Sequence, residues 1–337
     1  MRKTIITLHL LLISLTAALT SCVDEITFAD SPQGNFEALW KIMDEHYCFF
    51  DYKKEQLGVN WRDVYYKYRP KIKGANNEQL FEVLSNMLAE LQDGHVNLVS
   101  SFDFGRDWSW KEDYPANFSN LIYDKYIGKE YRIASGIPYR ILSDNIGYMR
   151  VSTFTREAGD GNLDEILIHL MPCRSLIIDI RDNGGGLITA ATKLASRFTN
   201  ENILVGYMQH KTGPGHNDFS AMRERRLKPS SHVRWQKPVF VLTNRGVYSA
   251  ANEFVMCMKQ CSNCTIVGDK TGGGAGLPFS SELPNGWGVR FSACPVYDVN
   301  RNSTEHGIEP DVECQMTKED MLREIDTIIE KARSLTK

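Results

Sequence analysis

The spacing of apolar residues differs between the first part of the chain and the rest. Before residue 98, apolar side chains recur every three or four positions, the period of a helix with one buried face. After residue 145, short apolar runs alternate with further helical stretches, the order typical of a largely parallel sheet. We therefore predict a small N-terminal helical subdomain over residues 35–98 and an α/β domain over residues 145–337.

Two helices are predicted in the N-terminal subdomain, at about residues 36–47 and 78–91. Asn35 is the expected cap of the first helix, and Asn76 or Asn77 that of the second, because an asparagine side chain accepts from free N–H groups at a helix start. Gly94 is the expected stop of the second helix. Residues 99–144 lack a clear period and are predicted to form a linking hairpin or loop region.

The α/β domain is predicted from apolar runs that end in polar or glycine-rich turns. The expected strands are residues 146–151, 175–180 and 238–243, with a late strand or hairpin at 286–296. Helices are expected at 163–170, up to about 198, up to about 260, and at 317–335. The last of these carries Thr317 and Asp320 with the spacing of a capping pair.

The N-terminus follows a different pattern from the rest of the chain. Arg2 and Lys3 precede an apolar stretch that ends in Leu19-Thr20-Ser21-Cys22, which is typical of a secretory signal. These four residues resemble a bacterial lipobox, so residues 1–21 are predicted to be a lipoprotein signal peptide and Cys22 the lipid attachment site. A plain signal peptide with a chance cysteine is the alternative. Residues 22–34 then form a tether, and the mature protein is held at the cell envelope, on its periplasmic face or the cell surface.

Charge and cysteine content exclude some classes of function. With 39 basic and 42 acidic residues, the formal net charge of -3 gives no reason to expect a nucleic acid partner. Cys257, Cys261 and Cys264 have a spacing seen in iron–sulfur proteins. An exported chain is a poor host for such a cluster, and cysteines on a buried helix pack as small apolar residues. No metal site is therefore expected.

Two predicted turns from strand to helix carry groups suited to nucleophilic catalysis. Ser249 follows the strand that ends at Thr243 and stands at a helix start, where serine is more often a cap. If it is a nucleophile, the N–H of Ala250 would point at the group that it attacks. The run Gly184-Gly185-Gly186 would let a substrate approach the backbone closely. Gly185, with Gly184 as the alternative, is the expected second donor of an oxyanion hole.

A serine nucleophile also needs a base, and spacing alone does not choose one. His95 lies in Asp93-Gly94-His95, a position that a buried structural histidine could equally occupy. Glu305 could orient such a histidine or could be a surface acid. The chain has 8 histidines, and the residues by themselves leave the choice among them open.

Four motifs in order supply a family resemblance. They are Leu176-Ile-Ile-Asp-Ile-Arg-Asp-Asn-Gly-Gly-Gly186, Tyr248-Ser249-Ala-Ala, Gly268-Asp-Lys-Thr-Gly-Gly-Gly-Ala-Gly276 and Gly307-Ile-Glu-Pro-Asp311. This series resembles the C-terminal processing (tail-specific) serine peptidases, particularly the branch that includes the tricorn core peptidase. The likeness covers most of residues 36–315. It implies an α/β core of the ClpP/crotonase kind, and the 99–144 interval is too short for the PDZ domain that many members carry.

The resemblance implies a Ser–His–Glu site rather than a Ser–Lys dyad. The lysine of the dyad branch would stand at Gly274, while Lys270 matches a different basic residue and Asn252 replaces a glutamate of that branch. The tricorn-like branch instead matches Ser249, His95 and Glu305.

The implied function is hydrolysis of peptides or unfolded proteins through an acyl-enzyme, with no cofactor. A catalytically weak or inactive peptide-binding lipoprotein of the same fold is the alternative. Chemistry on a coenzyme A thioester is disfavoured because an exported protein does not meet that cofactor.

Overall fold

A computed structural model describes residues 27–336 of the chain. The predicted signal peptide, Cys22 and the first part of the tether lie outside the described residues. Among the helices that are described, none has the length and apolar character needed to cross a membrane.

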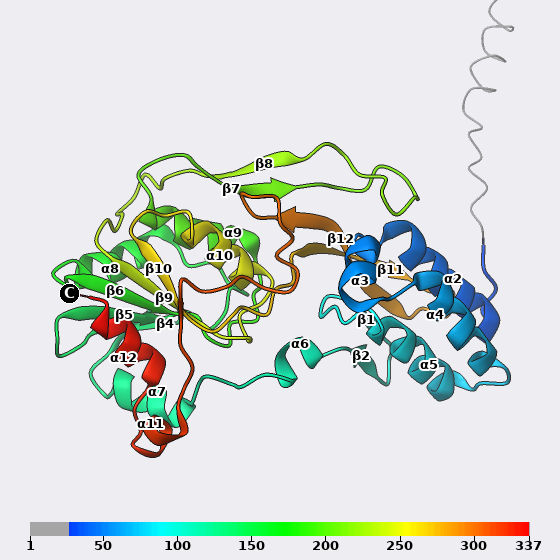
Figure 1. The fold of residues 1–337 in the computed structure, drawn as a ribbon, viewed down its shortest axis with the longest axis horizontal. Coiled ribbons are helices and arrows are strands. Elements are labelled where there is room, and N and C mark those ends of the chain that lie inside the picture. The colour runs from blue at the N-terminus through cyan, green and yellow to red at the C-terminus, as the bar shows by residue number, and fades with distance from the viewer. Residues whose placement is uncertain (1–26, 337) are drawn as a thin grey trace, which may run out of the picture.

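The larger sheet is the framework of the molecule (Figure 1). Its strand order is β13-β10-β9-β6-β5-β4-β3, parallel from β13 to β5 and antiparallel at β4 and β3. The strands are β3 (Arg132–Ala134), β4 (Ile137–Ile141), β5 (Ile146–Arg150), β6 (Ser175–Asp179), β9 (Val239–Thr243), β10 (Cys264–Gly268) and β13 (Val312–Glu313). The predicted strands at 146–151, 175–180 and 238–243 are thus confirmed.

Helices cover both faces of this sheet, and alternate strand residues divide between them. Leu176 and Ile178 of β6 belong to the main core with helices on one face, whereas Ile177 faces the other. The first face carries α8 (Asp160–Leu170), α9 (Ile188–Ala195) and α10 (Ala250–Met258), and the second carries α7 (Asn120–Ile127) and α12 (Thr327–Ser334). Because parallel strands are buried on both faces, they read as continuous apolar runs. The predicted α/β core with N-terminal helices is confirmed.

A second sheet joins the core to the N-terminal helices. Its order is β2-β1-β12-β7-β8, with β11 also paired to β12. The strands are β1 (Asn97–Val99), β2 (Phe104–Arg106), β7 (Ile203–Met208), β8 (Arg223–Leu227), β11 (Gly276–Glu282) and β12 (Gly288–Tyr297). The N-terminal helices are α2 (Pro32–His46), α3 (Phe50–Leu57), α4 (Trp61–Tyr68) and α5 (Asn77–Ala89). Their apolar faces share one core with residues of β1 and β12.

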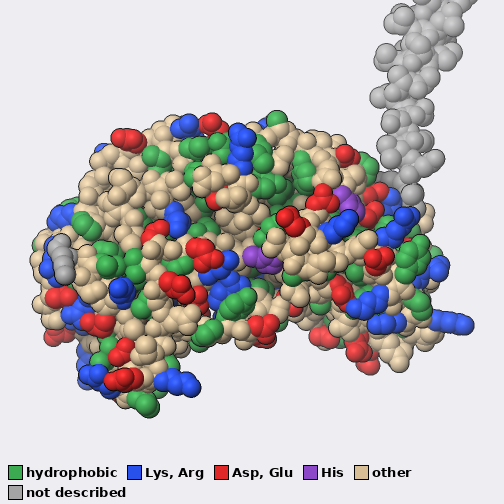
Figure 2. Space-filling model, in the orientation of Figure 1, with side chains coloured by type: hydrophobic (Ala, Val, Ile, Leu, Met, Phe, Trp, Pro, Cys, Tyr) green, Lys and Arg blue, Asp and Glu red, His purple; other side chains and the backbone are tan. Residues whose placement is uncertain are grey.

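The β7–β8 ribbon runs along the top of the molecule toward the N-terminal helices (Figure 1). In the loop after β7, His216 Nε2 lies 2.9 Å from Asp44 Oδ1 of α2, and its ring stacks on Phe50. Charges of both signs are interspersed over the face of the molecule that Figure 2 shows.

Several predicted element boundaries are wrong. α2 begins at Pro32, and Ser31 caps it in place of Asn35, whose buried side chain instead bonds Asp30 and Asn285. α5 ends at Ala89, so Gly94 does not stop it. For this helix, however, Asn76 does form the capping box.

Two other regions differ from their predictions. The interval 99–144 contains β2, α6 (Ser109–Glu112), α7, β3 and β4, so part of it belongs to the main sheet. The predicted helix at 317–335 is two helices, α11 (Lys318–Leu322) and α12, because Glu324 has a φ of 55° and Asp326 caps a new start. Thr317 caps α11 by accepting from Asp320 N–H, as predicted.

Candidate active site

Ser249 occupies a sharp turn between β9 and α10. Its φ of 56° and ψ of -120° lie outside the regions that a side chain normally allows, and such strain is typical of functional positions. The turn is held because Ser249 N–H donates to Gly273 O at 2.9 Å and Tyr248 N–H donates to Asn183 O at 3.0 Å. Ser249 stands at the helix start, yet its hydroxyl makes no capping bond. The serine is therefore presented to a pocket rather than used as a cap.

The imidazole of His95 lies beside Ser249, although the two residues are 154 positions apart in the sequence. Its Nε2 lies 3.0 Å from Ser249 Oγ. If Nε2 accepts the hydroxyl proton, Nδ1 carries the ring proton, which is the tautomer of a general base. Burial lowers the pKa of His95 to about 4, although the charge of Asp93 opposes this shift. The ring is thus neutral at physiological pH.

The glycine turn after β6 packs directly against the serine. Gly185 has a φ of 96°, and a Cβ placed there would lie 2.8 Å from Ala250 N and 2.9 Å from Ser249 Cβ. Ala250 is the first residue of α10, so its N–H has no partner within the helix. Gly185 N–H instead donates to Asn183 Oδ1 at 2.9 Å. The structure thus leaves Ala250 N–H available for an oxyanion and engages Gly185 N–H with a side chain, while Gly184 lies in open space.

Glu305 is not brought into contact with His95. Its Oε2 accepts from Ala275 N–H at 2.9 Å, and its Oε1 lies 3.3 Å from Lys53 Nζ. His95 Nδ1 is buried without a hydrogen-bond partner among residues 27–336. Burial and the nearby charge of Asp93 raise the pKa of Glu305 to about 8, against the opposing effect of Lys53. Glu305 thus supports the backbone beside the serine rather than holding the imidazole.

Asp93 is a buried carboxylate that the sequence analysis did not assign to the site. Its Oδ1 accepts from His95 N–H at 2.8 Å, and its Oδ2 accepts from the hydroxyls of Tyr47 at 3.0 Å and Ser292 at 2.9 Å. Burial would raise the pKa of Asp93, but Lys53, His95 and these bonds outweigh it and hold the pKa below its usual value. Its place two residues before His95 was the one available signal.

The turn around Ser249 also packs against an aromatic stack. Tyr248 lies between the imidazole of His95, at a ring distance of 5.0 Å, and the indole of Trp110, at 4.0 Å. Gly94 passes so close that a Cβ there would be 2.5 Å from Trp110 Nε1. Trp110 of α6, in the segment that links β2 to β3, thus helps to fix His95 through its contact with Tyr248.

The alternative base, a lysine, is not at the site. Lys270 Nζ pairs with Glu309 at 2.8 Å on the surface, and Gly274 occupies the position of the dyad lysine with a φ of 77°. Asn252 Oδ1 accepts from the Thr271 hydroxyl at 2.6 Å and so has a structural partner.

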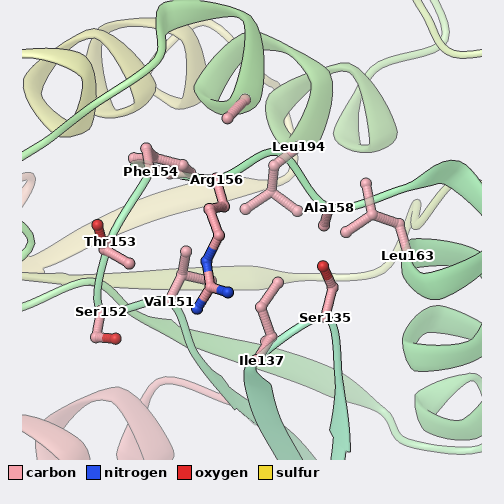
Figure 3. A pocket seen from close by; sticks show the side chains of 12 residues that line it. Ser135, Ile137, Val151, Ser152, Thr153, Phe154, Arg156, Ala158, Leu163 and Leu194 are labelled. Carbon is pink, nitrogen blue, oxygen red and sulfur yellow. The ribbon is translucent and has the colours of Figure 1, made fainter.

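A pocket opens beside Ser249. It is lined by Gly186 and Ile188, by Gly274 to Pro278, and by Val296 and Thr304. Glu253 also lines it, but its charge is paired with Arg225. Another hollow lies near the turn after β3. Figure 3 shows Arg156 extending into it toward Ile137 and Ser135. None of the candidate catalytic residues lines that second hollow.

The three cysteines Cys257, Cys261 and Cys264 pack within the fold. Cys257 and Cys261 are buried in the main core around α10, and Cys264 begins β10. Burial raises the pKa of all three thiols.

Comparison with protein families identifies the chain. The model of peptidase family S41 matches residues 145–314, and that of the tricorn protease C1 domain matches residues 28–89. The chain belongs to peptidase family S41. Its relatives include the carboxy-terminal processing protease CtpA of Bacillus subtilis, 23% identical over 175 residues, and the chloroplastic C-terminal processing peptidase of Tetradesmus obliquus, 26% identical over 188 residues. These alignments cover 51% and 53% of this chain but only 36% and 37% of the relatives.

Solved structures of other proteins share the fold. A candidate peptidase from Parabacteroides merdae is 53% identical, with a TM-score of 0.87 over 91% of this chain and 97% of its own. Mature CPAF in complex with lactacystin is 12% identical, with a TM-score of 0.70 over 90% of this chain and 97% of its own. The tricorn protease is 16% identical, with a TM-score of 0.55 over 90% of this chain and 36% of its own. The last two likenesses concern the fold alone.

Proposed function

We propose that this S41 family member is a serine endopeptidase that hydrolyses peptides or unfolded proteins through an acyl-enzyme. The observation that carries the proposal is the 3.0 Å approach of His95 Nε2 to Ser249 Oγ at a strained turn. A nucleophile within hydrogen-bond reach of a neutral base is the arrangement that acyl transfer requires.

In this mechanism Ser249 Oγ attacks the peptide carbonyl while its proton passes to His95 Nε2. The C–N bond then breaks, and the imidazolium returns the proton to the leaving amine. Water then attacks the ester as His95 takes its proton, and the imidazolium returns that proton to Ser249 Oγ as the acid product leaves. Ala250 N–H stabilises the oxyanion. Gly185 N–H would be the second donor if its hydrogen bond to Asn183 Oδ1 opened. Asp93 stabilises the imidazolium, and Glu305 acts through the backbone at Ala275.

Labelling with a fluorophosphonate tests the nucleophile. The parent protein should label and should cleave reduced, carboxymethylated α-lactalbumin, and Ser249→Ala should do neither. Ser101→Ala removes an exposed serine and is the matched control. Equal labelling of Ser249→Ala and the parent would refute the assignment. Binding of the unfolded substrate without cleavage by the parent would favour the alternative, an inactive peptide-binding lipoprotein.

We further propose that the protein works at the cell envelope, anchored by a lipid on Cys22, with residues 1–21 removed. The residues between Cys22 and the start of α2 at Pro32 would then form the tether. The support is the sequence of the N-terminus. Membrane fractions of an expressing bacterium should contain the parent protein, and Cys22→Ala should move it to the soluble fraction. Retention of Cys22→Ala in the membrane fraction would contradict a lipid anchor.

A further inference from the structure

One edge of β11 carries no strand. β11 pairs with β12 from Gly276↔Pro295 to Glu282↔Gly288, and no other strand of the described chain pairs with it. Edge strands present a row of free N–H and C=O groups that can bind another chain. Ser280 and Phe279 are exposed, the latter by 56%. The middle of this strand is therefore open to solvent.

The backbone groups that face this free edge can be assigned from the bonds at the two ends of the strand. Ala275 O accepts from Val296 N–H, and Leu283 N–H donates to Trp287 O, so these odd-numbered residues face β12. Along a strand, successive backbone groups point to opposite sides. The even-numbered residues Gly276, Pro278 and Ser280, and Glu282 beyond them, therefore face the free edge. Proline is tolerated there because its missing N–H would not have served the ladder.

This free edge begins at the nucleophile. Gly276 to Pro278 line the same pocket as Ser249, together with Gly186 and Ile188. Further along, Phe279 and Ser281 line a second hollow with Phe291 and Lys211. Residues of β11 thus line both hollows, the first from the beginning of the strand and the second from its middle.

We propose that β11 is the docking edge for the substrate, an unfolded polypeptide segment that adds to it as an extra strand. This proposal rests on the proposed function, since it assigns the same site its mode of substrate recognition. The seven residues from Gly276 to Glu282 span about 24 Å at ~3.4 Å per residue. The bound part of the substrate must therefore be extended over about five to seven residues on one side of the scissile bond. Recognition through the main chain tolerates many sequences but excludes folded helices.

Binding to the inactive Ser249→Ala protein tests this mode independently of turnover. An array of 12-residue peptides that tile reduced, carboxymethylated α-lactalbumin identifies the peptide that binds most tightly. This peptide is labelled with fluorescein, and a series of variants is made in which the backbone nitrogen of one residue at a time is methylated. N-methylation should weaken binding by ~10-fold at every second position over at least four residues, because one hydrogen bond to β11 is lost. No binding, or a loss without that two-residue period, would overturn the proposal.

Variants of β11 give a second test in the active protein. Ser280→Pro removes an N–H from the free edge but none from the β12 ladder, while the matched control Ser280→Ala keeps both. Ser280→Pro should raise KM for the 12-residue peptide by ~10-fold and leave hydrolysis of a short activated ester by Ser249 unchanged. Equal KM values for the two variants would contradict docking on β11. If Ser280→Pro fails to fold, the N-methylated series decides. If the parent protein does not hydrolyse the ester, the peptidase assignment fails, whereas equal KM values with intact ester hydrolysis reject only docking on β11.

Discussion

The two partners of the proposed catalytic pair are positioned by regions of different construction. Ser249 is fixed by backbone contacts within the α/β core: its strained turn joins β9 to α10, and backbone hydrogen bonds tie that turn to Gly273 and Asn183. His95 is fixed by side chains from distant segments that meet at Asp93. These are Tyr47 after α2, Ser292 in β12 and Tyr248 in the Ser249 turn, with Lys53 of α3 nearby. The first region is backbone geometry within the α/β core, and the second is a buried polar network between the core and the N-terminal helices.

This difference sets what each region should tolerate. A backbone turn is sensitive to volume and to φ, and indifferent to charge. A buried polar network is sensitive to the removal of any one charge, because the partner left behind stays unsolvated. Mutations can therefore separate the two regions, with activity lost first in one and folding stability lost first in the other.

The largest expected effect is on stability, in the His95 region. Lys53 is fully buried and is the cation beside both Glu305 and Asp93. Lys53→Met should lower the free energy of unfolding by ~3 kcal/mol, since it leaves Asp93 buried without that cation. Denaturant titration measures the change, with Lys54→Met, an exposed neighbour, as the control. A loss under about 1 kcal/mol, the size of an ordinary surface change, would show that the network does not depend on Lys53.

The Ser249 region should respond in activity. Gly185→Ala would place a Cβ 2.6 Å from Tyr248 O at a φ of 96°, so the turn beside the serine must shift. We expect fluorophosphonate labelling to slow by at least ~100-fold, comparable to loss of an oxyanion donor. Gly184→Ala is the matched control, because its Cβ meets nothing within 4 Å. Similar labelling rates for both variants would mean that the turn does not position Ser249.

The same contrast explains what could be predicted from the sequence. β9, Ser249 and the helix that follows are contiguous in the sequence, so apolar runs and a glycine-rich loop were enough to place β6, β9 and the serine. The family motifs then identified His95. The network around His95 could not be read in this way, because the partners of Asp93 are separated from it by 46 to 199 positions along the chain. For the same reason the pairing of the second sheet was not predicted, although a late strand or hairpin was expected at 286–296, where β12 lies. Glu305 was likewise expected at the imidazole.

The smallest expected effect concerns the coupling of the two regions through the imidazole. Only neutral His95 can accept the Ser249 proton, so labelling should fall as pH drops through the pKa of His95. Burial places that pKa at about 4, so the labelling rate at pH 5.5 should be nearly that at pH 7. A histidine with its ordinary pKa of about 6.5 would instead lose ~10-fold over this range. Asp93→Asn removes a charge that raises the pKa of His95, so its acid limb should move to lower pH still. An acid limb near pH 6.5 in the parent would show that the network does not hold His95 as buried, and the comparison between the two regions would fail at its central residue.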